Sequence, residues 1–446
     1  MKYKILLFWL FLSHLTAFAQ KPDGKRRQVG LADAITIALA NNPQLKAAGL
    51  SVQIAQNNAN PAMAGFYPRL SASANGGYNL QDTRLEFAAS NMEAIEVQSA
   101  ESFVYGGGLS LNYTLFDGLG NWYTLRQRKS EWALSQIEFE TQLENTIVNV
   151  SNRYFEMARW QEQWAIEQEN IAISLDRFQR AQLRSALGNS SGLELSSAAV
   201  DLRNDSLNLL NAHTQFLNAR RNLNALLGEN DPGDYLVETA VAFELLPNDS
   251  TLLFNALNQN NSLKSAQMAT QSQAYLVQAT KSDIWPQLDF STGYNYNVQE
   301  NEVGLLLFNR TNGLTAGLNL RWDLFSGWVN QIRIQNAKLS LKSAQNQLQQ
   351  AQYNLEAGFG NALQNHKNAL QSAGIAQRNI KLAQLNFDRA NELFKLGQLN
   401  RLEFREAQIN LSRAENQLAQ SHFAAKLAEI ELKRVCGMLA KPQTAE

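Results

Sequence analysis

The sequence predicts a mainly α-helical protein with a small transmembrane β part, built from a duplicated repeat of a helix, a strand hairpin and a long helix hairpin. Three observations support this fold class. The second half of the chain repeats the first, long proline-poor segments have heptad spacing, and four segments of about ten residues alternate between apolar and polar side chains.

The composition excludes several classes of protein. The 446 residues carry 39 basic and 40 acidic side chains, and this balance gives no positive field for a nucleic acid partner. A single cysteine, Cys436, excludes an intramolecular disulfide and argues against a cysteine-built metal site. Asn (46) and Gln (39) outnumber all charged residues, and only 25 Gly and 8 Pro are present. Long regular elements with an amide-rich surface are therefore expected.

No catalytic or metal-binding motif is recognisable. Of the four histidines, His14 lies near the N-terminus, and His213 and His422 occupy equivalent positions of the repeat. Zinc-protease, nucleophile-elbow and phosphate-loop patterns are missing from the sequence. The sequence therefore predicts no enzyme, no metal and no cofactor.

The N-terminus has the pattern of a secretory signal. Lys2 and Lys4 precede an apolar run over 5–17, and Ala17-Phe18-Ala19 resembles a cleavage site. The alternative, an N-terminal membrane anchor, is disfavoured because the run is shorter than the ~20 residues of a span. We expect a signal peptide over 1–19, export, and a linker over 20–30.

The sequence contains an internal duplication. Residues 38–46 recur as 256–264, a shift of 218, and residues 108–118 recur as 317–327, a shift of 209. One insertion between Asn79 and Gly108 explains the change of shift, and we place it in a surface loop. The predicted organisation is repeat 1 over 31–228, a linker over 229–250, repeat 2 over 251–438 and a tail over 439–446.

Each repeat contains two predicted strands. They span about 68–79 and 103–116 in repeat 1, and about 287–298 and 314–325 in repeat 2. A soluble sheet packed on helices would show the same alternation as strands that face lipid. In the membrane interpretation, the lipid-facing residues include Leu109, Leu111, Tyr113, Leu318, Leu320 and Trp322.

Four strands cannot close a barrel. Open edges in lipid would leave backbone groups without partners, at several kcal/mol each. Several chains must therefore share one barrel, and three chains would supply twelve strands, enough for an open lumen. The Gly, Ser, Asn and Asp side chains of the second face suit such a wet interior.

Heptad spacing predicts two long helices, over about 120–187 and 329–396, each about 100 Å long. Both end at a Leu-Gly turn, and shorter helices return over about 191–228 and 400–437. The helix expected before the first strand, about Pro43 to Phe66, contains Pro61, which should kink or end it.

This organisation resembles the TolC-like outer-membrane efflux family. The likeness covers nearly the whole chain after the signal, and its order and duplication are more specific than any single motif. It is carried by Asn42-Pro43 and Asn260-Asn261, by Pro68 and Pro286 before strands, by Leu115-Phe116-Asp117-Gly118 and Leu324-Phe325-Ser326-Gly327, and by the two Leu-Gly tips.

The resemblance implies a homotrimer in the outer membrane with a long periplasmic extension. Three chains would form a 12-stranded β-barrel continuous with a 12-helix α-barrel. The function implied is a passive exit duct of a tripartite efflux or secretion system, with a periplasmic adaptor and an inner-membrane pump of the resistance-nodulation-division or ABC type. The candidate adaptor-docking tips are Leu187, Gly188, Asn189, Leu396, Gly397 and Gln398.

The resemblance also implies a pore constriction just past the second tip, at Glu403 and Glu406. Repeat 1 keeps only Glu194, with Ser197 in the second position, and a solvated helix face beside Arg401 and Arg405 is the other interpretation. Two alternatives for the whole protein remain: a protein-secretion duct of a type I system, and a periplasmic coiled-coil tether that never enters a membrane.

Overall fold

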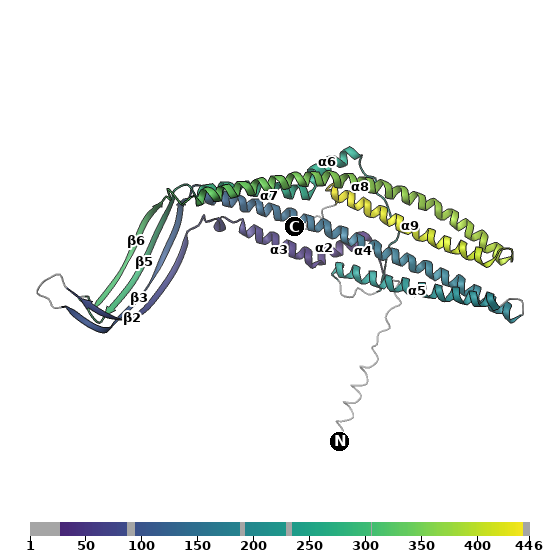
Figure 1. Ribbon diagram of the computed structural model, residues 1–446, viewed down its shortest axis with the longest axis horizontal. Helices are drawn as coiled ribbons and strands as arrows, with labels where there is room; N and C mark the ends of the chain where they lie inside the picture. The colour runs from purple at the N-terminus through teal and green to yellow at the C-terminus, as the bar shows by residue number, and fades with distance from the viewer. Residues whose placement is uncertain (1–26, 87–93, 188–191, 229–233, 305, 440–446) are drawn as a thin grey trace, which may run out of the picture. The chain divides into compact units, whose positions relative to one another are not determined.

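The computed structural model (Figure 1) describes residues 27–86, 94–187, 192–228, 234–304 and 306–439. The predicted signal peptide lies outside these residues, as do tip residues Gly188 and Asn189. The elements, in chain order, are β1 (Arg27–Val29), α2 (Leu31–Asn41), α3 (Pro43–Asn58), η1 (Pro61–Ala64), β2 (Arg69–Leu85), β3 (Ile95–Phe116), α4 (Gly120–Ala186), α5 (Gly192–Leu227), β4 (Tyr235–Val237), α6 (Asp249–Gln259), α7 (Asn261–Ser282), β5 (Gln287–Asn301), β6 (Phe308–Arg321), α8 (Val329–Lys395) and α9 (Arg401–Val435).

The chain forms two compact units. The sheet unit comprises Ala47–Thr141 and Asn260–Glu356. The helical unit comprises the remaining segments, Met1–Lys46, Gln142–Gln259 and Ala357–Glu446. Helices α4 and α8 begin in the sheet unit and end in the helical unit, where α5 lies along α4 and α9 lies along α8 (Figure 1).

The duplication extends further toward the N-terminus than predicted. The order β1, α2, α3, β2, β3, α4, α5 recurs as β4, α6, α7, β5, β6, α8, α9. Two segments expected to be linkers, 20–30 and 229–250, thus contain strands β1 and β4, which pair in parallel from Arg27–Tyr235 to Val29–Val237. Three-residue strands carry no alternation that a sequence pattern could reveal.

Strands β2, β3, β5 and β6 form one antiparallel sheet in that order. β2 continues to Leu85 and β3 begins at Ile95, so much of the segment predicted as a loop between Asn79 and Gly108 is strand. The strand register shifts between Gln81 and Thr83, opposite Ser99 with its positive φ, and this irregularity interrupts the alternation. β6, in contrast, ends at Arg321 and not near residue 325.

Asparagine side chains start the helices before the sheet. The Asn42 side-chain oxygen accepts from the backbone N–H of Gln44 (2.9 Å) and Leu45 (3.2 Å), and that of Asn260 accepts from Leu263 (3.1 Å). These caps satisfy backbone donors that a helix leaves free at its first turn. As predicted from Pro61, α3 ends before this proline, at Asn58, and a short 3₁₀ turn follows.

The long helices α4 and α8 each contain 67 residues, which corresponds to about 100 Å. None of the helices in the described residues combines the length and the apolar composition of a membrane span.

The main core of the helical unit surrounds Tyr154 of α4. Val150, Tyr154 and Met157 are buried against Phe216 and Leu223 of α5. The Tyr154 hydroxyl lies 3.0 Å from the carbonyl oxygens of Val29 and of Glu238, at the ends of β1 and β4. Burial raises the pKa of this hydroxyl, which therefore stays a donor.

Both return helices end at a glycine in the left-handed region. Gly228 (φ +70°) lies against Asn41 at the end of α2, and Gly437 (φ +65°) lies against Gln259 at the end of α6. A Cβ atom at Gly437 would stand 2.7 Å from the Cβ of Gln259. Glycine is therefore needed both for the backbone conformation and for the close approach.

Candidate functional site

One face of the sheet is apolar. The cross-strand register aligns Leu109 with Tyr294, Tyr113 with Phe290, and Phe290 with Leu318. Leu318 and Leu320 are each 66% exposed in the chain, which shows how little of this face the chain itself covers. Of the six residues predicted to face lipid, the structure brings five onto this face: Leu109, Leu111, Tyr113, Leu318 and Leu320.

Trp322, the sixth, lies just beyond β6. Its indole nitrogen donates to the backbone oxygen of Ile284 (3.1 Å), in the turn between α7 and β5. The expectation that Trp322 is a strand residue is therefore wrong. The indole hydrogen bond fixes it at the end of the sheet, where the ladder stops at Arg321.

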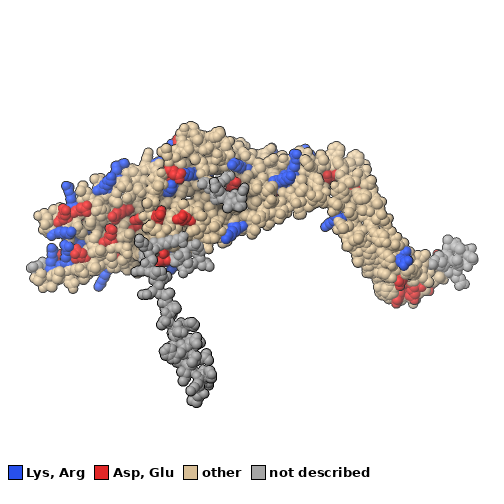
Figure 2. All heavy atoms as spheres, turned by 180° about the vertical axis from the view of Figure 1, so that it is seen from behind, with Lys and Arg blue, Asp and Glu red and all other residues tan. Residues whose placement is uncertain are grey.

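The opposite face of the sheet is polar but almost uncharged. The Ser71 and Ser110 hydroxyls are 3.0 Å apart, and Thr114 donates to Asp289 (2.8 Å). Within the strand segments 70–81, 102–116, 288–299 and 311–320, Asp289 is the single charged residue. Figure 2 shows few charged side chains over the sheet, and most of those seen there gather toward its outer end.

Glycines in β3 make room for amide side chains on the polar face. A Cβ at Gly106 would lie 2.3 Å from the side-chain oxygen of Asn297, and one at Gly108 would lie 2.3 Å from that of Asn295. The two asparagine side chains of β5 therefore lie across the neighbouring strand, where only glycine leaves space.

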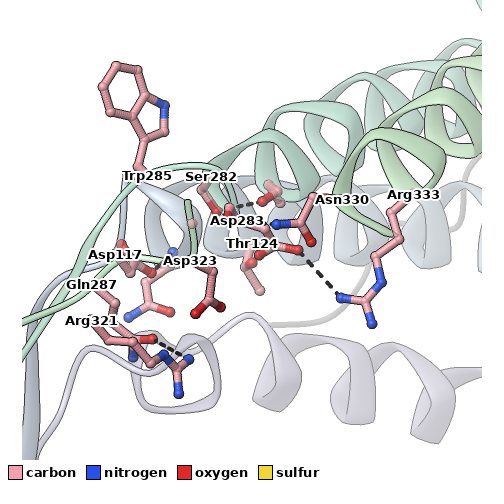
Figure 3. Close-up of a pocket in the computed structure, with 13 residues that line it drawn as sticks. Asp117, Thr124, Ser282, Asp283, Trp285, Gln287, Arg321, Asp323, Asn330 and Arg333 are labelled. Atoms are coloured by element: carbon pink, nitrogen blue, oxygen red, sulfur yellow. Dashed lines mark hydrogen bonds and ion pairs between the residues drawn. The ribbon is translucent and has the colours of Figure 1, made fainter. Parts of the chain in front are cut away.

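A polar cavity of about 410 Å³ lies where the helices of the sheet unit meet the strands (Figure 3). Arg321 donates to Gln287 (3.2 Å), Arg333 lies 3.9 Å from Asp283, and Trp285 points away from the cavity. Among the described residues, no group of three His, Cys, Asp or Glu side chains is placed to hold a metal ion. The cavity is lined by residues of both repeats.

The described tip residues are exposed. Leu187 is 74% exposed and Leu396 is 69% exposed, although both are large and apolar. Gly397 has a left-handed backbone (φ +72°), which ends α8 and turns the chain through Gln398 toward α9. An exposed leucine beside each turn is a feature that capping does not explain.

The two predicted constriction residues, Glu403 and Glu406, lie on the exposed side of the first turns of α9. The Asn400 side chain caps this helix by accepting from the Glu403 N–H (3.0 Å). The arginines at 401 and 405, expected to neighbour these glutamates, lie instead against carboxylates of α5. Glu403 and Glu406 are thus left without a cationic partner in the described chain.

A buried ladder of ion pairs joins α4, α5 and α9. Arg405 binds Asp205 with N–O distances of 2.6 and 2.8 Å, and Asp205 also accepts from the Ser174 hydroxyl. Arg177 lies 2.9 Å from Asp201. Burial lowers the pKa of Arg177, whereas the hydrogen bond to Asp205 raises that of Arg405.

Sequence reasoning missed this ladder. The only signal was the equal spacing of two pairs, Asp201 with Asp205 and Arg401 with Arg405, each four residues apart on a helix. Nothing in the sequence says that the two pairs meet.

The fold and this arrangement can be compared with known proteins. Residues 34–229 and 252–438, which cover both repeats, match the family described as outer membrane efflux protein. The chain belongs to the outer membrane efflux protein family. Membership confirms the resemblance read from the two repeats and the prediction that the protein is not an enzyme. It also decides against a tether that never enters a membrane.

Solved structures of outer membrane channels share the fold. The CmeC channel of Campylobacter jejuni superposes with a TM-score of 0.75 at 18% identity, over 95% of this chain and 90% of that chain. The open state of the MtrE channel of Neisseria gonorrhoeae gives a TM-score of 0.71 at 17% identity, over 93% and 91% of the two chains.

Among curated relatives, protein CyaE of Bordetella pertussis is 22% identical over 326 residues. The match covers 72% of this outer membrane efflux family chain but 65% of CyaE, a little under two thirds of that relative's length.

Proposed function

We propose that the protein is the outer-membrane exit duct of a tripartite efflux system. Three copies conduct small molecules passively across the periplasm and outer membrane after docking to a periplasmic adaptor and an inner-membrane pump. Family membership supports the outer-membrane and efflux parts of this proposal. The apolar sheet face that includes Leu109 and Leu318 would contact lipid, and the polar face would line the pore.

The open sheet is the observation that supports the trimer. Within the described chain, β2 and β6 each have a neighbour on one side only. Free backbone groups on strands with an exposed apolar face are not tolerated in lipid, so the edges must pair between copies. The twelve strands of three copies make a barrel wide enough for a channel.

The internal repeat supplies the register of that pairing. Inside the chain, Leu111 of β3 lies opposite Thr292 of β5. The counterpart of Leu111 in repeat 2, 209 positions later, is Leu320 of β6. The counterpart of Thr292 in repeat 1, 218 positions earlier, is Ala74 of β2. The repeat symmetry therefore predicts that Leu320 of one copy lies opposite Ala74 of the next. Both residues belong to the apolar face, as the pairing requires.

A second contact follows the same symmetry. Gly118, between β3 and α4, packs on Trp285, and a Cβ there would stand 2.7 Å from the Trp285 Cβ. The counterparts are Gly327, which has no atom within 4 Å of its ideal Cβ, and Tyr67, which is 62% exposed. We infer that Gly327 of one copy receives Tyr67 of the next.

Cross-linking between copies tests the proposal. The double variant Ala74→Cys/Leu320→Cys, treated with a short bifunctional thiol reagent in membranes, should give dimers and trimers on a denaturing gel and nothing larger. The matched control Tyr78→Cys/Leu320→Cys moves one thiol four residues along β2, about 13 Å away, and should remain uncoupled. A chain that stays monomeric in both, or couples only in the control, would overturn the arrangement.

In the proposed duct, the ends of the long helices carry the adaptor-docking tips and the pore constriction. Leu187, Gly188, Asn189, Leu396, Gly397 and Gln398 form the adaptor-docking tips, supported by the exposed leucines. Glu403 and Glu406 of three copies form a ring of six carboxylates at the narrow end of the duct. Their exposure and lack of a cationic partner in the described chain support this role.

A further inference from the structure

A cationic pocket of about 350 Å³ lies beside the end of α8, within the helical unit. Its apolar wall includes Phe387, Phe394 and Phe404. Its basic side chains are Arg177 and Arg180 of α4 and Lys395, the last residue of α8. Cavities of this size with aromatic walls and a few charged groups are typical of small-molecule sites.

The pocket has more positive than negative charge around it. In the ladder behind it, the Asp201 carboxylate is shared by Arg177 (2.9 Å) and Arg401 (3.4 Å), because Arg405 occupies Asp205. Three guanidinium groups thus contact two carboxylates, and the charge of Glu167 acts on Arg405 as well. On the pocket side, Asp176 pairs with Arg180, and Lys395 has no ion-pair partner in the described chain.

One donor on a residue of the pocket wall is buried and unused. The Arg177 side chain is only 5% exposed, and its Nη1 makes no hydrogen bond to any described residue. Its Cζ lies 5.5 Å from the centre of the Phe404 ring, so charge and aromatic wall are adjacent. Buried guanidinium donors are normally all satisfied, so this one calls for an acceptor that the described residues do not supply.

We propose that this pocket binds a small organic acid, with its carboxylate between the Arg177 guanidinium and the Lys395 ammonium, and its apolar body against Phe394 and Phe404. A carboxylate supplies the missing acceptor and offsets the excess charge, and the forked guanidinium suits its geometry. A bound acid would join α4 to the α8–α9 hairpin next to the tip. The proposal does not depend on the trimer or on adaptor docking.

Fluorine NMR on the purified full-length protein in detergent micelles tests the proposal with two probes of equal shape. Para-fluorophenylacetate carries the carboxylate, and para-fluorophenylacetamide replaces it with a neutral amide. The acid resonance should broaden and shift saturably with protein, and the amide resonance should not. Equal binding of both probes would show an apolar crevice only and would overturn the proposal.

Two sets of variants test whether the acid binds in this pocket. Lys395→Met together with Arg180→Met should weaken binding of the acid at least about tenfold, the usual effect of losing a charge-assisted hydrogen bond. Lys381→Met, two heptads earlier on α8 and outside the pocket, should leave it unchanged. Because all three side chains are largely exposed, folding should be retained, and circular dichroism verifies this. Binding that survives the double variant, or is lost equally in the control, would contradict the site.

Discussion

The Arg405 guanidinium holds the Asp205 carboxylate through two hydrogen bonds, Nη2 to Oδ1 at 2.6 Å and Nη1 to Oδ2 at 2.8 Å. The Asp205 side chain is 3% exposed and the Arg405 side chain is 19% exposed, so a largely buried ion pair joins α9 to α5. Removing one partner would leave the other charge buried and unpaired.

We therefore expect Arg405→Ala to lower the free energy of unfolding by about 3–5 kcal/mol. The double variant Arg405→Met/Asp205→Asn should lower the free energy of unfolding by less, because neither charge of the pair is left buried without its partner. Thermal unfolding followed by circular dichroism measures both, with Arg389→Ala on the exposed side of α8 as the control. A double variant as damaged as the single one would refute this account.

Gly437 should be intolerant of any side chain. Gly437→Ala places a methyl group against Gln259 and forces a left-handed backbone, which costs about 1–2 kcal/mol before the steric contact is counted. Gly360→Ala, inside α8 with open space around its Cβ, should be stabilising by about 0.5–1 kcal/mol. The difference in melting temperature between the two alanine variants checks the prediction, and equal behaviour would disprove it.

Glu415 on α9 should make stability depend on pH. Burial, with the charges of Glu169 and Glu162, raises its pKa to about 7 from an ordinary value of 4.5. Between these values the folded chain binds more protons than the unfolded chain, so the contribution of this group to stability falls as pH rises from about 4.5 through 7.

Glu415→Gln should remove that part of the pH dependence and raise the melting temperature most above pH 7. His366, whose pKa burial lowers, acts in the opposite direction, so the comparison needs both variant and parent at each pH. If the melting temperatures of the variant and the parent differed by the same amount at every pH from 5 to 8, this would count against a raised Glu415 pKa.

The two faces of β6 should respond differently to charge. Leu318 lies on the apolar face and Asn319 on the polar face. If the apolar face contacts lipid, Leu318→Arg should make the free energy of insertion into the membrane less favourable by about 2–4 kcal/mol. Asn319→Arg should leave it almost unchanged. The yield of folded protein in lipid vesicles at increasing urea measures this. Equal tolerance at both positions would mean that the apolar face is covered by protein.

Exchanging Glu403 and Glu406 for alanine should change conduction without affecting the fold, because both side chains are exposed. If they ring the narrow end of the duct, the double variant should show higher single-channel conductance in planar bilayers or weaker block by multivalent cations. The matched control Glu392→Ala changes an exposed carboxylate on α8. Conductance and block identical to those of the parent chain would exclude the constriction role.

The sequence was most informative where a pattern repeats. Heptads placed α4 and α8, alternation placed the sheet and its two faces, and Asn42 and Asn260 marked helix starts that the structure shows as capped. Each of these signals is local, and tertiary contacts only reinforce it.

Long-range partners could not be predicted in the same way. The pairing of β1 with β4 and the ladder around Asp205 join residues about 200 positions apart, and no local period records them. Trp322 was assigned to a strand because alternation continues through it, whereas the ladder stops at the pair Gln287–Arg321 and the Trp322 indole donates to Ile284. The unused Nη1 of Arg177 is visible only once neighbouring helices are in place.

The parallel pairing of β1 with β4 means that neither half of this duplicated chain is self-sufficient. The strand that opens the first half finds its partner only in the strand that opens the second, and Tyr154 reaches one acceptor from each. If the two halves were made as separate chains, β1 and β4 would each lack the strand with which it pairs.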